Sequence, residues 1–178
     1  MPAIGDAKIL IMATNGFEES ELFGPREILM GKGAEVRLAS PSLSPIQATV
    51  HDDPGKTIRP DLTFSDVKPE EYDALLLPGG VRNPDALRLD KQAVALIKAL
   101  ADAGKPVAAI CHGPWLLVEA EVVRGRRVTS WPSIRTDLRN AGAVVVDEAA
   151  VTDGNIVTSR KPSDVPAFTE ALILLIES

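Results

Sequence analysis

Cys111 is the residue best placed to act as a nucleophile. It is the only cysteine in the 178-residue chain, and it directly follows a run of small apolar residues, Val107–Ile110. Ala109 and Gly113 lie two residues before and two residues after it, the spacing of small residues that a sharp strand-to-helix turn around a nucleophile requires. Pro114 then favours the start of a helix. The pattern predicts a nucleophile elbow with Cys111 at its apex.

A cysteine at such an apex is expected to be reactive. The N–H groups and the dipole of the following helix favour a negative charge on the sulfur of Cys111. This placement lowers a thiol pKa from about 8.5 to roughly 3.5–7.5, so we expect a thiolate. The competing interpretation is a buried structural cysteine, because free cysteines are commonly buried. A single cysteine excludes an internal disulfide and any CxxC metal or redox pair.

Only two histidines, His51 and His112, could serve as a base. No histidine follows His112, so a catalytic triad with a histidine far downstream cannot form within the chain. We expect the His112 ring to reach the sulfur only loosely, oriented by a carboxylate from elsewhere. His51 lies in a Pro/Gly-rich segment and is expected to be a solvated loop residue. Two histidines are too few for most zinc sites, and we expect neither metal nor cofactor.

Three glutamates follow the first apolar run, at the predicted carboxyl edge of the sheet where Cys111 also lies. They are Glu18, Glu19 and Glu21. One of them could stay protonated beside the sulfur and donate a hydrogen bond to it. The others would complement the dipole of the next helix, and the spacing does not identify which is which. Pro78–Gly80 ends another apolar run, and its backbone N–H groups could hold an oxyanion or form a plain turn.

Short apolar runs alternate with longer amphipathic ones along the whole chain. This alternation predicts an α/β sandwich with a largely parallel sheet, built as one domain over residues 1–178. The expected strands are residues 8–13, 35–39, 73–77, 106–110, 144–146 and 155–159, with weaker strands at 46–50 and 57–59. The expected helices are residues 20–32, 91–103, 114–120, 133–141 and 165–176.

Charge and composition exclude several classes of function. The net charge is −6 and the basic residues form no patch, so nucleic acid is not expected as a partner. The segment 14–19 has one glycine where a dinucleotide fold has G-x-G-x-x-G, which argues against dinucleotide binding. No apolar run approaches the roughly 18 to 20 residues of a membrane span. A free cysteine without an export signal predicts a cytoplasmic location.

Five segments of the chain together resemble the ThiJ/PfpI family of the class I glutamine-amidotransferase-like superfamily. The matching segments occur in family order over nearly the whole chain, at residues 15–22, 61–64, 73–80, 104–114 and 153–160. The resemblance implies a flavodoxin-like three-layer sandwich with a reactive elbow cysteine at Cys111 and an adjacent His112. It assigns Glu18 as the carboxyl that hydrogen-bonds the thiol.

The resemblance also implies an oxyanion site and an oligomer. It places backbone oxyanion donors around Gly80 and His112, and we name Gly79, Gly80 and Gly113 as the expected oxyanion and substrate-binding residues. In the PfpI-like branch, an acid from a neighbouring subunit orients the histidine, and the corresponding residue here is Asp85. Asp85 is one methylene shorter than the family's glutamate, and the segment before it is about one residue longer. A homo-oligomer, either a dimer or a hexamer, is therefore expected.

The family's activities set the functional expectation. They include ATP-independent intracellular proteolysis, repair of early glycation adducts, glutathione-independent glyoxalase chemistry and oxidative-stress sensing. We expect a stress-protective cysteine-dependent hydrolase that acts on glyoxal-derived adducts, with small-molecule aldehydes or glycated proteins as substrates. Peptidase activity and glyoxalase-like conversion of methylglyoxal to lactate are the enzymatic rivals. The alternative is a non-catalytic redox sensor or chaperone that acts through oxidation of Cys111.

Overall fold

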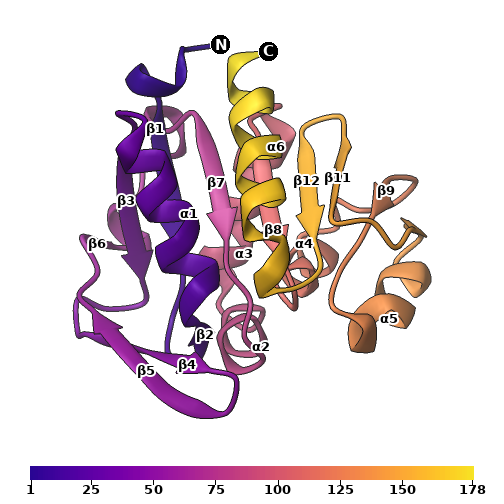
Figure 1. Cartoon of the computed structure of the whole chain (residues 1–178), viewed down its shortest axis with the longest axis horizontal. Coiled ribbons are helices and arrows are strands. Elements are labelled where there is room, and N and C mark those ends of the chain that lie inside the picture. The colour runs from indigo at the N-terminus through magenta and orange to yellow at the C-terminus, as the bar shows by residue number, and fades with distance from the viewer.

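A seven-stranded sheet runs through the molecule, with helices on both of its faces (Figure 1). The computed structural model describes residues 1–178. The strand order is β11-β12-β8-β7-β1-β3-β6, and every pair is parallel except β11 with β12. These strands are β1 (Lys8–Met12), β3 (Glu35–Ser40), β6 (Leu62–Thr63), β7 (Ala74–Leu77), β8 (Val107–Ile110), β11 (Ala150–Asp153) and β12 (Ile156–Ser159). The predicted α/β fold with a mostly parallel sheet is confirmed.

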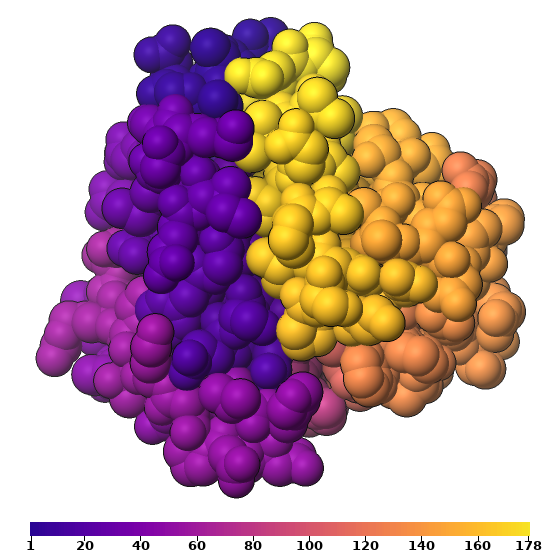
Figure 2. Space-filling view, in the orientation of Figure 1, coloured from indigo at the N-terminus to yellow at the C-terminus, as the bar shows by residue number.

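Helices form the two outer layers. They are α1 (Glu19–Gly31), α2 (Arg82–Leu87), α3 (Lys91–Asp102), α4 (Pro114–Glu119), α5 (Arg135–Asn140) and α6 (Val165–Glu177). Figure 1 shows α1 and α6 over one face of the sheet, Figure 2 shows their surfaces side by side, and the two helices pack against each other. α3 and α4 pack against β8 on the opposite face. No helix has the length and apolar character needed to cross a membrane.

Alternate residues of each central strand face different cores. In β1, Ile9 and Ile11 belong to the core under α1 and α6, whereas Leu10 and Met12 belong to the core under α3 and α4. This alternation follows from the two-residue period of a strand. Because both faces of the sheet are covered, its central strands are continuous apolar runs, which is the pattern that made them predictable.

A second, three-stranded sheet lies beside the carboxyl edge of the main sheet (Figure 1). It consists of β2 (Phe17–Glu18), β4 (Ile46–Val50) and β5 (Asp53–Ile58). β4 and β5 form a hairpin that contains His51, whose φ is 56°. β2 pairs in parallel with β4, and Glu18 is opposite Thr49. This pairing holds the hairpin next to the loop that follows β1.

Several elements differ from the sequence prediction, including the two-residue strands β2 and β6, which were missed. Helix α2 was not expected, because tertiary hydrogen bonds rather than apolar periodicity hold it: the buried Asn83 accepts the Thr14 N–H at 2.8 Å and donates to Pro78 and Gly79 carbonyls. The antiparallel strand β11 was also missed. The segment expected as a late strand near residue 144 is β10 (Val144–Val145), which pairs with β9 (Arg127–Val128) outside the main sheet.

Candidate active site

Cys111 lies immediately after β8, at the apex of a tight turn into α4. Its φ of 64° is in the left-handed region, which residues with a side chain rarely adopt. Gly113 makes this turn feasible, because a Cβ there would lie 2.7 Å from the Leu77 carbonyl oxygen and 2.8 Å from that of Ile110. The elbow expected from the small residues around Cys111 is present. Strained backbone of this kind is concentrated at functional sites.

The carboxyl that meets the thiol belongs to Glu21, and the assignment of Glu18 to this contact was wrong. Glu21 is fully buried, and its carboxyl hydrogen-bonds with the Cys111 thiol. Its Oε2 also accepts the Gly79 N–H at 2.8 Å. The two carboxylate oxygens of Glu18 instead accept the backbone N–H of His51, at 3.1 and 3.3 Å.

Helical geometry explains why Glu21 and not Glu18 faces the sulfur. Glu18 is extended and paired within β2, so its side chain is directed to the hairpin. Glu21 lies in the first turn of α1, on the same buried face as Pro25 and Leu29. Residues four apart share one face of a helix, so the spacing of Glu21 from these two apolar residues was the available signal.

Burial decides the protonation of Glu21. Removal from water raises the pKa of Glu21 to about 8, the Gly79 N–H opposes this rise, and the negative charge of Glu18 adds to it. The carboxyl therefore keeps its proton at neutral pH. Its Oε1 is buried and has no hydrogen-bond partner. A protonated Glu21 is thus available as a proton donor beside the sulfur.

Burial also raises the pKa of the Cys111 thiol. Repulsion from Glu21 once that carboxyl is ionised, and its hydrogen bond to the thiol, raise the pKa of Cys111 further, while the N–H groups of His112 and Gly80 act in the opposite direction. The sequence-based prediction of a lowered thiol pKa took account only of the helix that follows Cys111, and that helix has only six residues. That prediction left out the desolvation of Cys111, which is 6% exposed. Glu21 and Cys111 together hold at most one negative charge.

Gly79 and Gly113 do not serve as oxyanion donors, contrary to expectation. The Gly79 N–H is donated to Glu21, and the Gly113 N–H is donated to the Ile110 carbonyl at 2.8 Å. Both groups are therefore engaged within the protein. Their role is to set the shape of the two turns, since a Cβ on Gly79 would lie 2.8 Å from the Cys111 Cβ.

The N–H groups of Gly80 and His112 are the ones directed at the sulfur. Neither has a backbone acceptor, although the Gly80 N–H also interacts with the Glu21 carboxyl. Gly80 has a φ of 75°, and a Cβ there would collide with the Gly16 carbonyl oxygen. Only glycine fits this position without moving the neighbouring loop. These two N–H groups could stabilise an oxyanion formed next to Cys111.

The His112 ring lies closer to the sulfur than expected. Its Nδ1 is 3.3 Å from the Cys111 Sγ, and its Nε2 is 3.3 Å from the Ser133 Oγ. The ring stacks on Trp131 with centroids 6.0 Å apart and meets Trp115 edge-on at 5.3 Å. Burial lowers the pKa of His112, so the imidazole is neutral at neutral pH. A neutral imidazole can accept the thiol proton.

Ser133, which the sequence analysis did not name, occupies the position at Nε2 where an acid was expected. It belongs to the short 3-10 helix η4 (Pro132–Ile134), and no sequence motif marks it. Asp85 is exposed on α2 and makes no hydrogen bond or ion pair with His112 in this chain. Contact between Asp85 and the His112 of another copy stays a prediction.

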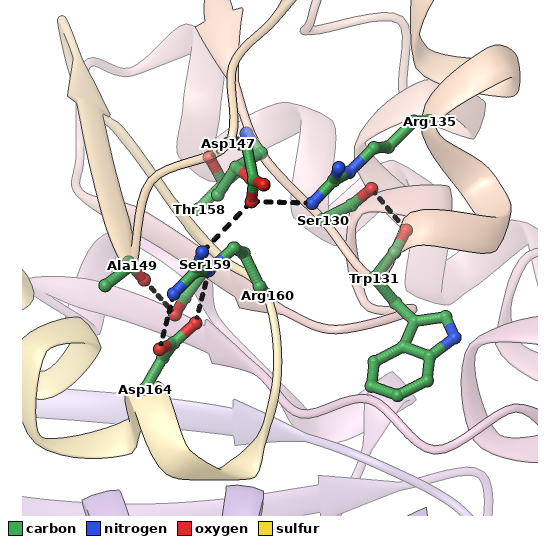
Figure 3. A network of polar contacts seen from close by, with 10 residues as sticks. Ser130, Trp131, Arg135, Asp147, Ala149, Thr158, Ser159, Arg160 and Asp164 are labelled. Carbon is green, nitrogen blue, oxygen red and sulfur yellow. Dashed lines mark hydrogen bonds and ion pairs between the residues drawn. The ribbon is translucent and has the colours of Figure 1, made fainter.

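A polar network anchors the segment that carries η4 (Figure 3). Asp147 Oδ1 accepts hydrogen bonds from Arg135 at 2.8 Å and from Arg160 at 3.0 Å. Arg160 also binds Asp164 through two hydrogen bonds of 2.8 and 3.1 Å. The start of α5 is thereby tied to the end of β12 and the start of α6. This arrangement fixes η4 against the His112 ring.

The site opens into a cavity of about 430 Å³. The elbow contributes Cys111 and His112 to its wall, and η4 contributes Ser133. The hairpin contributes His51, which was expected to be a solvated loop residue and was not named as part of the site. His51 is exposed, as predicted, but its backbone holds Glu18 in the wall. No group of three or more His, Cys, Asp or Glu side chains is placed to bind a metal ion.

Comparison with known proteins agrees with this geometry. Residues 7–175 match the model of the DJ-1/PfpI family. The chain belongs to the DJ-1/PfpI family. The resemblance to the ThiJ/PfpI family that the sequence indicated is therefore confirmed.

Family members include named deglycases. The chain is 44% identical over 170 residues to Deglycase PH1704 of Pyrococcus horikoshii, covering 96% of this chain and 99% of that protein. It is 41% identical over 179 residues to Protein/nucleic acid deglycase 2 of Escherichia coli, covering 94% and 97%. A crystal structure of a ThiJ/PfpI domain protein from Brachyspira murdochii superposes with a TM-score of 0.88 at 26% identity, covering 96% and 95%.

Proposed function

We propose that this protein is a cysteine-dependent deglycase. Its substrates are the early adducts that glyoxals form with amines and thiols, and its products are the free amine or thiol and a hydroxy acid. The observation that carries the proposal is the meeting of Cys111, a protonated Glu21 and a neutral His112 in one cavity. The deglycase names of relatives that match nearly the whole chain support it.

The first step transfers the glyoxal unit from the amine to the sulfur. For a methylglyoxal adduct, the bond between the carbinol carbon and nitrogen breaks, and a bond between that carbon and Cys111 Sγ forms. The thiol proton passes through His112 Nδ1, 3.3 Å from the sulfur, to the departing nitrogen. The amine is released and the glyoxal unit is held as a hemithioacetal.

The second step is an internal redox reaction that needs no external oxidant. His112 takes the proton from the carbinol carbon and returns it to the neighbouring ketone carbon, while Glu21 carries the hydroxyl proton between the two oxygens. The first carbon is oxidised to a thioester and the second is reduced to an alcohol. The negative charge on oxygen during this transfer lies near the N–H groups of Gly80 and His112.

The third step releases the product. Water adds to the thioester carbon, the carbon–sulfur bond breaks, and the sulfur recovers a proton. The net reaction is adduct plus water to amine plus lactate. Peptide hydrolysis is less well supported, because within one copy of this chain His112 Nε2 meets a serine hydroxyl, and a carboxylate that would stabilise an imidazolium would have to come from another copy.

The test separates a deglycase from a glyoxalase that consumes free methylglyoxal. A hemithioacetal is prepared from methylglyoxal and increasing excess of 2-mercaptoethanol, so that free methylglyoxal falls while the adduct stays nearly constant. Lactate production by a deglycase stays constant across this series, and lactate production by a glyoxalase falls in proportion to free methylglyoxal. Cys111→Ser should abolish turnover. Lactate formation by that variant at the wild-type rate would disprove the proposal.

Asp85 is proposed to act across an interface between copies of this chain. It is exposed on α2, so a second copy could reach it. Asp85→Asn should lower turnover in an assembly of two or more copies, measured by sedimentation and lactate assay together. A monomer with full activity would exclude this role.

A further inference from the structure

Glu18 is a buried carboxylate without a cationic partner. It is 8% exposed and lines the same cavity as Cys111. Its hydrogen bonds come from one group, the backbone N–H of His51. None of the ion pairs in the protein includes it. A carboxylate has about four acceptor positions, and the His51 N–H is the one protein donor that reaches those of Glu18.

The rest of the cavity wall does not supply the missing positive charge. No lysine or arginine lines it, and a further acid, Asp52, lies beside His51 in the hairpin. Buried charges in proteins are normally paired. A cleft lined by one sign of charge raises the local concentration of ligands of the opposite sign. The wall is therefore complementary to a cation.

We propose that Glu18 binds a positively charged group of the substrate. The site then prefers glyoxal adducts of compounds that carry an ammonium or guanidinium group over adducts of carboxylates or phosphates. This preference rests on the proposed deglycase function for the reacting end of the substrate. The cation site itself depends only on Glu18 and the cavity that it shares with Cys111.

A purely structural role of Glu18 makes a different prediction. In that case its carboxylate only fixes the hairpin by accepting the His51 N–H. Glu18→Gln separates the two roles, because the amide oxygen of glutamine still accepts this hydrogen bond while the negative charge is lost. Glu19→Gln is the matched control, since Glu19 is the next residue and its Oε2 accepts the Lys56 N–H at 2.7 Å.

The first measurement needs no turnover. Two methanethiosulfonate reagents, one with a trimethylammonium group and one with a sulfonate group, form a disulfide with Cys111 and release methanesulfinate. The ratio of their rate constants is divided by the same ratio for 2-mercaptoethanol, which cancels intrinsic reactivity. We expect a preference of about tenfold for the cationic reagent in the wild type, on the order expected for one nearby charge in a partly buried site. It should fall to near one in Glu18→Gln and persist in Glu19→Gln.

The second measurement tests the same preference in turnover. Hemithioacetals of methylglyoxal with 2-(dimethylamino)ethanethiol, 2-mercaptoethanol and 3-mercaptopropionate share the reacting group and differ in charge. The cationic adduct should have the lowest KM in the wild type, and Glu18→Gln should remove this difference.

The two measurements can disprove the cation site and the deglycase function independently of each other. Equal reactivity toward both reagents in the wild type, or an unchanged preference in Glu18→Gln, overturns the cation site even if all three adducts are hydrolysed. A reagent preference that depends on Glu18, without hydrolysis of any adduct, overturns the deglycase function and leaves the cation site standing.

Discussion

The Glu21 carboxyl and the Cys111 thiol meet in the interior, where α1 passes the end of β8. Burial raises the pKa of both groups, and the Gly79 N–H binds the carboxyl on its other side. Two acidic groups in contact cannot both be ionised at low cost. The reactivity of the site therefore depends on how many protons the Glu21–Cys111 pair holds.

The alkylation rate of Cys111 should keep rising above neutral pH. The raised pKa of the thiol means that the thiolate fraction grows as pH rises, with a midpoint above the ordinary value of about 8.5. The measurement is the rate of iodoacetamide labelling between pH 5 and 10. The urea-unfolded protein, labelled in parallel, supplies the ordinary midpoint. A rate that levels off below pH 7 would show that the N–H groups of Gly80 and His112 outweigh burial.

Glu21→Gln should change how stability depends on pH. The folded protein holds the Glu21 proton up to about pH 8, whereas the unfolded chain releases it near the ordinary pKa of about 4.5. Between these two pKa values the folded state thus binds more protons than the unfolded chain. The contribution of Glu21 to the free energy of unfolding is fully present below the lower value. This contribution is lost as pH rises, by up to about 1.4 kcal/mol per pH unit.

Urea unfolding of the wild type and Glu21→Gln at pH 5, 6, 7 and 8 measures this effect. The wild type should lose stability relative to the variant as pH rises, because glutamine cannot titrate. Glu19→Gln should follow the wild type. Parallel curves for the wild type and Glu21→Gln would show that Glu21 titrates normally in the folded protein.

Ser133→Ala should reduce turnover without abolishing it. The substitution removes the hydroxyl that lies 3.3 Å from His112 Nε2, a hydrogen bond worth about 1 kcal/mol, or roughly fivefold in rate. The kcat should fall more than the KM changes, and nitrogen-15 NMR of the imidazole should show an altered balance of its two neutral tautomers. Ser133→Thr keeps the hydroxyl and should restore both. An unchanged tautomer balance in Ser133→Ala would show that the Ser133 hydroxyl does not hydrogen-bond to the His112 ring.

Gly80→Ala should destabilise the protein more than Gly104→Ala. Both glycines have a φ of 75°, so both substitutions incur left-handed backbone strain of about 1–3 kcal/mol. A Cβ on Gly80 also collides with the Gly16 carbonyl, whereas no atom lies within 4 Å of a Cβ on Gly104. Urea unfolding of the two variants gives the difference. Equal losses would mean that the loop after β1 moves freely, and Gly80→Ala should then keep its activity.

Much of the fold could be predicted from local patterns. The central strands are continuous apolar runs because both faces of the sheet are covered, and Ile9 to Met12 illustrate this. The elbow could be predicted because its constraint is local: small residues must flank Cys111 on each side. Helix α2 could not, since long-range hydrogen bonds of Asn83 hold it in place.

The sequence by itself determined the α/β class, the elbow and the position of its cysteine, because each depends on residues a few positions apart. Only the tertiary structure decided which glutamate meets the sulfur. It turned Glu21 to the core and Glu18 to the hairpin, and it brought Ser133 to His112 from a distant segment. It also decided the direction of the thiol pKa, since desolvation depends on everything packed around Cys111 and not on the helix that follows it.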